Sequence, residues 1–342
     1  MFVLDGVPSI MNLVKMATPI KQICFINLPG HASLPHKFIL NTISDDVHET
    51  SPDHINIYEG DSLAEAKSLL ENTHFDIVVT NVPSVEIFST VRSKLPHATT
   101  ILITDTSMEK YSVSLDGKED IFLDHVIANR YPQKWTINEL RVTLKKMTSH
   151  DLFGIGKYME PGSFINSQII TRSADRDVYN KLVMKTAEDA GLSQHLSKLI
   201  FGITEELLMN AIYDAPVASG NTYYHELPRT TSIELKPHEY STLSYAFDCN
   251  TFAIAVQDPF GALKRDKFFQ YLKKVISRAD ATHLIDSKKG GAGLGLFKIL
   301  YSSHSLVCNI EAQKRTEVIA LIDAHHQIRD FSKMPRSVHY FI

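Results

Sequence analysis

The sequence predicts an α/β protein with two domains. From Lys21 onward, short apolar runs alternate with stretches of helical periodicity, which is typical of a parallel sheet covered by helices. The chain has 342 residues, more than a single core of ordinary size needs. Hydrophobic residues make up 44% of the chain and charged residues 22%, so it has enough apolar side chains to bury two cores.

Residues 20–149, after an N-terminal extension of residues 1–19, are predicted to form a flavodoxin-like doubly wound domain. The expected strands run from Ile23 to Leu28, His54 to Tyr58, Asp76 to Thr80, Thr100 to Thr104 and His125 to Ala128. The expected helices run from Ser62 to Glu71, Val85 to Leu95 and Ile137 to Met147. Asp61 or Ser62 is expected to cap the first helix, with Glu65 completing a capping box.

The stretch from Tyr58 to Glu86 resembles the middle of a bacterial response-regulator receiver domain. In that family a strand ends on the aspartate that accepts phosphate, and Asn81 holds this position here. An amide cannot form an acyl phosphate. The family's magnesium-binding acidic pair is missing after the first strand, and so is its lysine near Asn129, although Thr104 matches its switch hydroxyl. The resemblance implies a receiver fold without receiver chemistry; the alternative is an unrelated doubly wound domain.

Residues 150–173 are rich in glycine and are predicted to be a linker to a second domain, residues 174–326. That domain is expected to open with two helices, the first closed by Gly191 and the second running from near Ser193 to Ala215. A strand is expected from Thr251 to Val256. The tail, residues 327–342, is apolar and aromatic and is expected to dock on the body in preference to a partner.

Three polar side chains share one face of the second helix, because Glu206, Asn210 and Asp214 recur every four residues. An amide oxygen can ligate a hard cation while an acid one turn away orients a water or a hydroxyl. A solvated helix face is the alternative. The strand that follows ends on Asp258, a carboxylate suited to accept the exocyclic amine of a purine, or simply part of a turn.

Four glycines within residues 290–295 lead directly into an apolar helix. Backbone amides at a helix N-terminus bind phosphate, and glycine lets the ligand approach closely. A flexible hinge is the alternative. A dinucleotide-binding fingerprint is disfavoured because the preceding strand is missing.

The three features occur in the order of the N, G1 and G2 boxes of the GHKL ATPases, the family of histidine kinases and anti-sigma-factor kinases. The resemblance covers about residues 175 to 324. It implies a two-layer α/β sandwich of the Bergerat type that binds ATP and Mg²⁺. By resemblance, Glu206 is the general base, Asn210 the magnesium ligand and Asp258 the adenine-reading carboxylate. The other expected nucleotide-binding residues are Asp214, Gly261, Lys289, Gly291, Gly293, Leu294 and Gly295.

The G1 box departs from the family pattern. The usual DxGxG would place glycines at positions 260 and 262, whereas Phe260 and Ala262 stand there and only Gly261 is a glycine. Phe260 is expected either to stack on the base or to obstruct it. Asp214 stands where the small anti-sigma-factor kinases often have histidine, which leaves its role open. Residues 264–290 would form the ATP lid, with cations that clamp phosphates and an amphipathic helix that packs on the domain.

These observations predict a bacterial cytoplasmic signalling protein, a protein kinase or ATPase of the anti-sigma-factor type regulated by a receiver-like domain that cannot be phosphorylated. The alternative is an inactive nucleotide-sensing adaptor that switches protein partners. A signalling protein partner and a homodimer are the expected assemblies. The net charge of −4 gives no support to nucleic-acid binding, and no apolar run approaches the roughly 20 residues of a membrane span. Three scattered cysteines fit a reducing cytoplasm.

Overall fold

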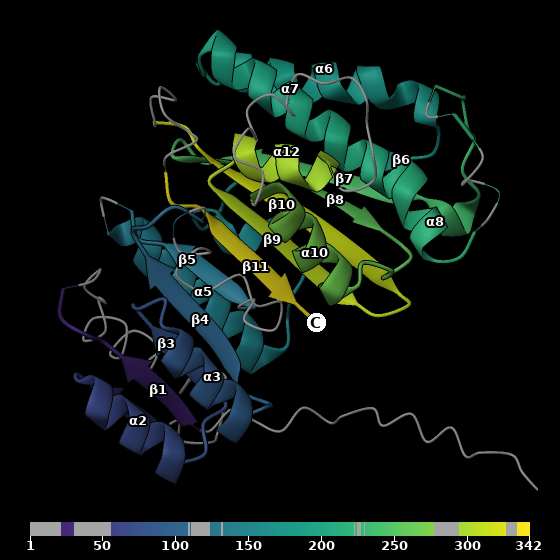
Figure 1. The fold of residues 1–342 in the computed structure, drawn as a ribbon. Helices are drawn as coiled ribbons and strands as arrows, with labels where there is room; N and C mark the ends of the chain where they lie inside the picture. The colour runs from purple at the N-terminus through teal and green to yellow at the C-terminus, as the bar shows by residue number, and fades with distance from the viewer. Residues whose placement is uncertain are drawn as a thin grey trace, which may run out of the picture.

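The structure, a computed structural model, is a mixed α/β fold with one large mixed sheet (Figure 1). It describes residues 22–30, 56–108, 110, 124–130, 133–221, 223, 227–228, 230–276, 294–325 and 334–342. The expected N-terminal extension, residues 1–19, lies outside these residues.

Within the described residues, eleven strands form one sheet in the order β2-β1-β3-β4-β5-β11-β9-β10-β8-β7-β6. The strands are β1 Gln22–Ile26, β2 Asn56–Gly60, β3 Ile77–Thr80, β4 Thr99–Thr104, β5 His125–Ala128, β6 Ile165–Ile170, β7 Ser241–Phe247, β8 Thr251–Asp258, β9 Ser305–Glu311, β10 Arg315–Asp323 and β11 Ser337–Phe341. Strands β1 to β5 pair in parallel, whereas β6 to β10 pair antiparallel.

The five strands expected in the first half are confirmed, with shifts of one or two residues at their ends. Strands β1, β3, β4 and β5 are mostly buried because helices cover both faces of a parallel sheet, whereas the edge strand β2 is mostly exposed or half-buried. Helices α2 (Leu63–Asn72) and α3 (Val85–Lys94) cover one face, and α5 (Lys134–Ser149) covers the other. The cap of α2 is also confirmed, since Ser62 Oγ accepts from the Glu65 N–H at 3.2 Å.

In the second half, one face of the sheet carries three stacked helices, α6 (Arg176–Asp189), α7 (Gln194–Met209) and α12 (Leu294–Ser302) (Figure 1). Gly191 closes α6 with φ +81°, and Ser193 caps α7, as expected. The opposite face packs on α5, whose Val142 belongs to a cluster with Ala253 and Val307. Helix α5 therefore contributes to the cores of both halves.

Two stretches outside the two expected domains belong to the sheet. Residues 150–173, expected to be a linker, contain the short η2 helix Ile155–Tyr158 and the edge strand β6. The tail docks on the body, as expected, and does so as strand β11, every residue of which is buried. Strand β11 pairs antiparallel with β5 and parallel with β9, so it joins the two halves into one sheet.

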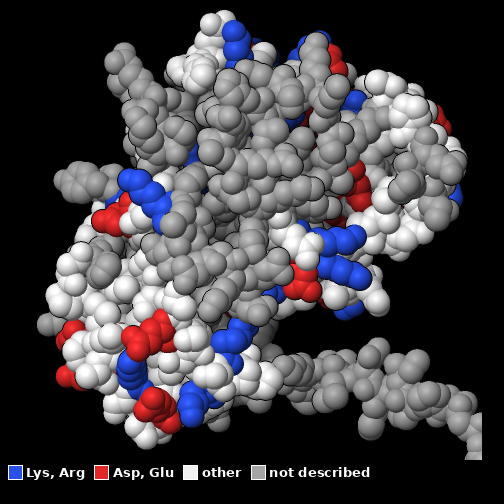
Figure 2. All heavy atoms as spheres, viewed as in Figure 1, with Lys and Arg blue, Asp and Glu red and all other residues white. Residues whose placement is uncertain are grey.

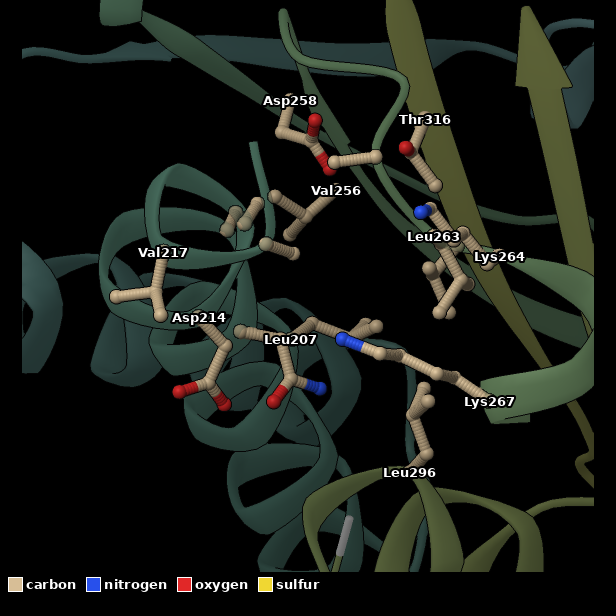
Figure 3. A pocket seen from close by; sticks show the side chains of 16 residues that line it. Leu207, Asp214, Val217, Val256, Asp258, Leu263, Lys264, Lys267, Leu296 and Thr316 are labelled. Carbon is tan, nitrogen blue, oxygen red and sulfur yellow. The ribbon is translucent and has the colours of Figure 1, made fainter. Parts of the chain in front are cut away.

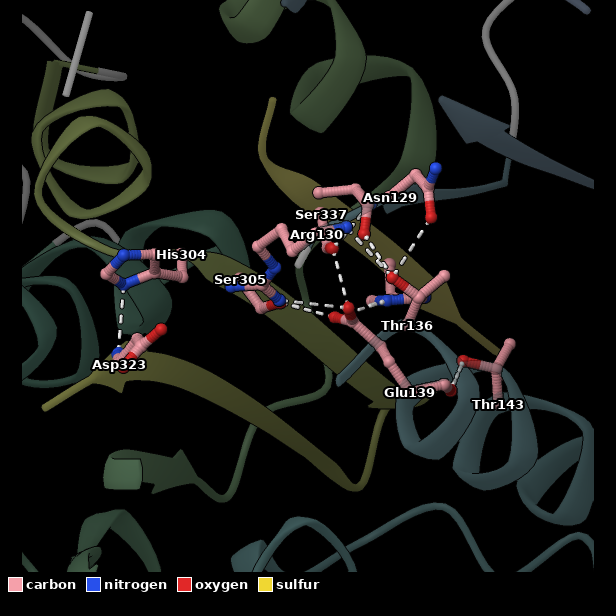
Figure 4. A network of polar contacts seen from close by, with 11 residues as sticks. Asn129, Arg130, Thr136, Glu139, Thr143, His304, Ser305, Asp323 and Ser337 are labelled. Atoms are coloured by element: carbon pink, nitrogen blue, oxygen red, sulfur yellow. Dashed lines mark hydrogen bonds and ion pairs between the residues drawn. The ribbon is translucent and has the colours of Figure 1, made fainter. Parts of the chain in front are cut away.

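A buried network of polar side chains surrounds this junction (Figure 4). Glu139 of α5 is 5% exposed and accepts from Ser337 Oγ at 2.7 Å, Arg130 Nη2 at 3.1 Å and His339 Nε2 at 3.2 Å. Ser305 of β9 donates a further hydrogen bond to it. One carboxylate thus connects α5, β9 and β11, and the charge is paired as a buried charge must be.

On the described part of the face shown in Figure 2, Lys and Arg side chains are interspersed with Asp and Glu side chains. No broad patch of a single charge is visible there. Among the residues that the structure describes, no helix is both long enough and apolar enough to cross a membrane.

Candidate functional site

A cavity of about 320 Å³ lies between α7, the end of β8, α10 (Arg265–Ile276) and α12. Most of its wall is apolar, and Figure 3 shows Leu207, Val256, Leu263 and Leu296 around it. Such a wall suits a flat apolar ring, with the few polar side chains fixing its orientation. Among the polar groups, Asp258 and Thr316 lie at one end and Asp214 and Lys267 lie farther from it, and Asn210 and Lys264 also line the cavity.

Asp258 ends β8 and lies opposite Thr316 of β10 in the antiparallel ladder. The carboxyl is 7% exposed, and burial raises its pKa to about 6, although the backbone N–H of Phe260 at 2.9 Å opposes the rise. The hydroxyl Oγ1 of Thr316 is buried beside this carboxyl and also opposes the rise in its pKa. A hydrogen-bond acceptor and a hydroxyl therefore line the same end of the cavity, next to apolar walls.

Asn210 and Asp214 line the cavity from a segment that differs from the expected regular helix. Residues Asn210–Asp214 form a π-helical turn between α7 and the short α8 (Ala215–Ala218). The Ala215 N–H donates to the Asn210 carbonyl oxygen, and Pro216 follows without an N–H of its own. Proline clashes with the carbonyl of an α-turn that precedes it, and a wider turn avoids that clash.

Asn210 is the candidate magnesium ligand, and its Nδ2 is buried without a hydrogen-bond partner among the described residues. Lys264 and Lys267 line the cavity from the start of the expected lid. Figure 3 shows Lys267 extending from α10 toward Leu207. The expected packing of the lid helix on the domain is confirmed, since Phe268 and Phe269 are buried.

Glu206, the candidate general base, does not belong to the described wall of the cavity. Its Oε1 accepts from Lys298 Nζ of α12 at 2.7 Å. Gly295, at the start of α12, packs directly on this helix face: a methyl group in place of its hydrogen would lie 2.8 Å from Glu206 Oε2 and 3.0 Å from Asn210 Oδ1. The start of helix α12 therefore packs against the side chains of Glu206 and Asn210.

Gly261 and Phe260 lie outside the cavity wall, which continues at Ala262 and Leu263. Gly261 has φ +58°, and its carbonyl oxygen accepts from the Gln313 N–H at 3.2 Å. A side chain at this position would overlap the Glu311 carbonyl oxygen in the turn between β9 and β10. Close packing of two backbones explains this glycine.

Several expected site residues fall outside the described part of the chain. These are Lys289, Gly291 and Gly293, and of Leu294 only its place as the first residue of α12 is described. Arg265, expected among the lid cations, pairs through Nε with Asp124 Oδ1 at 2.9 Å. This ion pair connects α10 to the segment that precedes β5.

Asn81, which the sequence resemblance places at the phosphoacceptor position of a receiver, is 1% exposed and holds the loop after β1. Its Oδ1 accepts from the Leu28 N–H at 2.9 Å, and its Nδ2 donates to Asn27 Oδ1 and to the Leu28 carbonyl oxygen, both at 3.0 Å. An amide supplies both a donor and an acceptor, which a carboxylate does not.

Comparisons with known proteins show no close relative. No protein-family model matches the chain. No curated protein matches it either. Among solved structures, a chain of the SiaB-SiaC complex from Pseudomonas aeruginosa is similar over 45% of this chain and 88% of its own, with 15% identity and a TM-score of 0.31.

A diacylglycerol kinase from Bacillus anthracis str. Sterne is similar over 94% of this chain and 96% of its own, with 10% identity and a TM-score of 0.24. Homoserine dehydrogenase from S. aureus is similar over 93% of this chain and 98% of its own, with 11% identity and a TM-score of 0.23. TM-scores this low do not establish a common fold, and such identities do not transfer a function.

Sequence reasoning missed Thr316 and Lys298, because neither belongs to a motif. Thr316 reaches the cavity only through the pairing of β10 with β8, and Lys298 reaches Glu206 only through the packing of α12 on α7. The position of Lys298, one turn after Gly295, was a usable signal, since both then lie on the same face of α12.

Proposed function

We propose that the cavity binds Mg-ATP and that the chain is a signalling protein with a GHKL-type nucleotide domain. The observation that carries this proposal is that Asn210 and Asp258, which are far apart in sequence, line one cavity while Gly295 packs on Asn210. These are the three boxes of the resemblance. The stack of α6, α7 and α12 on one face of β6 to β10 accords with the two-layer sandwich of that family.

The residues present fit this ligand. Asp258 accepts a hydrogen bond from the exocyclic amine of adenine when ionised, Thr316 Oγ1 lies beside this carboxyl, and the apolar walls hold the ring. Asn210 presents an amide oxygen to a cation, and magnesium in such sites is bound by few protein groups together with the phosphates. Lys264 and Lys267 supply positive charge near the phosphates.

For the enzyme, a protein kinase or ATPase, bound Mg-ATP would supply the terminal phosphoryl group and leave as ADP, and the acceptor would be a hydroxyl of a protein partner or water. Glu206 then orients the acceptor and takes its proton, after leaving Lys298. Lys298 remains beside the site as a cation. The proposed assemblies are a complex with a signalling protein partner and a homodimer.

The second candidate is a nucleotide-sensing adaptor without turnover. The observation that favours it is the ion pair between Glu206 and Lys298, because a carboxylate held by a lysine outside the cavity wall is a poor proton acceptor. In that case, bound ATP would change the position of α12 and of the lid, and this change would alter the contacts with a protein partner.

The first half acts as a receiver-like regulator that is not phosphorylated. Its parallel strands follow the order 2-1-3-4-5 of flavodoxin-like folds. Asn81 is committed to the loop after β1 and cannot accept phosphate. Strand β11 and Arg265 connect this half to the nucleotide half, so regulation would pass through these contacts.

Titration calorimetry with ATP, ADP and GTP, with and without Mg²⁺, tests the shared claim. Magnesium-dependent binding of ATP is expected, and Asn210→Ala should weaken it by about tenfold or more, the loss of one ligand to a bound cation. Gln194→Ala removes an exposed amide at the N-terminal end of α7 and should leave affinity unchanged. No ATP binding in the intact protein would overturn both candidates.

The fate of labelled ATP separates the candidates. Hydrolysis or transfer that is lost in Glu206→Ala supports the enzyme. Magnesium-dependent binding without turnover, the same in Glu206→Ala, supports the adaptor and rules out the enzyme.

A further inference from the structure

A second cavity, of about 380 Å³, lies on a different face of α7 from the first. Helix α7 contributes Phe201 and Glu205 to this cavity but Leu207 to the nucleotide cavity, and the two cavities share no lining residue. The start of α6, the π-helical turn and residues 230–232 complete the wall. The volume lies at the lower end of the roughly 300–1,000 Å³ of ligand sites, which suits a small metabolite.

Hydrogen bonds hold the walls of this second cavity in place. Tyr213 of the π-helical turn donates through its hydroxyl to the Thr231 carbonyl oxygen at 2.9 Å. Ser173 Oγ accepts from the Ile233 N–H at 2.8 Å, and the Ser173 N–H donates to the Ile233 carbonyl oxygen at 2.9 Å. The cavity is therefore a preformed feature of the fold.

Two polar side chains in this wall have unused hydrogen-bonding groups. Asn180 is 2% exposed, and its Nδ2 donates to Glu205 Oε2 at 2.7 Å. A carboxylate only accepts, so this bond fixes the orientation of the amide and turns Oδ1 away from Glu205. No described residue donates to that oxygen.

Arg176, in contrast, has hydrogen-bond donors that lack an acceptor. Its Nε and Nη1 are buried and have no hydrogen-bond partner among the described residues. Glu205 Oε1 lies 3.6 Å from Nε, beyond hydrogen-bond distance, and the guanidinium carbon lies 5.3 Å from the centre of the Tyr213 ring. Buried donors and acceptors without partners are unfavourable and are rare in folded proteins.

The missing partner must accept from Arg176 and donate to Asn180. A carboxylate matches the planar guanidinium, and an ammonium group matches an amide oxygen beside a glutamate. We propose that this cavity binds a free α-amino acid, with its carboxylate on Arg176 and its ammonium group on Asn180 Oδ1 and Glu205. An α-amino acid carries both charges on one carbon, and Arg176 and Asn180 lie one turn apart on α6 and both line the cavity.

Occupancy of this cavity would act on the nucleotide cavity through shared elements. Glu205 precedes Glu206 in α7, and Tyr213 precedes Asp214 in the π-helical turn. A ligand that holds Glu205 and Tyr213 in place therefore restricts the movement of their neighbours in the nucleotide site, Glu206 and Asp214. Binding of the amino acid itself does not depend on the proposed nucleotide function.

The test uses the full chain without nucleotide. Thermal unfolding is measured with each of the standard α-amino acids, and with acetate and methylammonium as half-ligands at the same concentration. At least one amino acid is expected to raise the midpoint, and neither half-ligand is. The affinity of that amino acid is then measured by calorimetry. If no amino acid raises the midpoint, the cavity holds water only and the proposal is overturned.

Two variants locate the binding. Arg176→Met and Asn180→Leu should each weaken it by at least about tenfold, the usual effect of losing one charge-assisted hydrogen bond. Arg172→Met removes an arginine that pairs with Asp175 outside this cavity and should bind as the wild type does. Asn180→Leu removes the unpaired oxygen that is proposed to accept from the ammonium group. If Arg176→Met does not fold, the proposal can still be tested with Asn180→Leu.

Binding that persists in both variants would place the amino acid elsewhere and overturn the proposal. ATP affinity, measured separately without amino acid, reports on the nucleotide function alone. The two proposals therefore fail independently.

Discussion

Gly295 is the residue at which the candidate motifs touch, and it gives the most direct test of the site. Gly295→Ala would place a methyl group 2.8 Å from Glu206 Oε2 and 3.0 Å from Asn210 Oδ1. Both are ends of side chains, which move at little cost, so stability should change by less than about 1 kcal/mol. The displaced Asn210 should bind Mg-ATP less tightly, by about tenfold, in calorimetry. Unchanged affinity would mean that this contact has no part in nucleotide binding.

Asp258 makes ATP affinity depend on pH. Burial raises the pKa of its carboxyl to about 6, and the ionised form is the stronger acceptor for the amine of adenine. Affinity should therefore be constant well above pH 6 and fall as the pH drops through that value. Calorimetric titrations on both sides of the pKa measure this. Asp258→Asn should bind more weakly at high pH and lose the pH dependence; a variant that keeps it would assign the titration to another group.

Asn210 and Asp258 could be identified from the sequence because each belongs to one of the ordered motifs. In the structure both residues line the same cavity. The sequence could not place Glu206 beside Lys298 or Gly261 against the turn after β9, since both contacts join segments far apart in the chain. The second cavity left no sequence signal, because it depends on Arg176 and Asn180 facing residues 230–232.

Among the elements, those predicted best are the ones whose burial leaves a regular pattern. Strands β1, β3, β4 and β5 are covered on both faces and are mostly buried and apolar. Strand β6 was missed because it is an edge strand with alternate residues exposed and follows a stretch with three glycines and a proline. The π-helical turn was missed because a four-residue repeat assumes regular α geometry, which Pro216 prevents.

Helix α7 contains a glycine that its fold does not require. Gly202 is exposed, and a methyl group there would meet no atom within 4 Å. Gly202→Ala should raise the free energy of unfolding by about 0.5–1 kcal/mol, because alanine loses less backbone freedom on entering a helix. Chemical denaturation measures the change. The variant is also the matched control for Gly295→Ala and should bind ATP unchanged; a loss of stability would mean that α7 is strained at this position.

At the scale of the whole molecule, the sheet is continuous only because the C-terminal strand β11 lies between β5 and β9. The sequence predicted that the tail docks, but not that it joins two sheets, since a five-residue strand carries no information on its partners. The contact also brings His339 of β11 beside Glu139 of α5. The two halves therefore share backbone ladders and a buried charge, and we expect them to unfold in one transition.

Acid should weaken this junction in a defined range. Burial alone would raise the pKa of Glu139, but the hydrogen bond from His339 and the charge of Arg130 outweigh it and hold the pKa at about 2, below the usual 4.5. A lowered carboxyl pKa contributes stability that is complete above pH 4.5 and is lost as the pH falls toward 2. Its contribution is on the order of 3 kcal/mol.

Denaturant unfolding at a series of pH values measures this contribution. Glu139→Gln keeps the shape of the side chain but removes the charge, so it should be less stable than the wild type at neutral pH, and the difference should shrink below pH 4.5. Glu160→Gln, at an exposed glutamate outside the network, should follow the wild type throughout. A difference between Glu139→Gln and wild type that does not change with pH would show that the carboxylate charge does not hold the halves together.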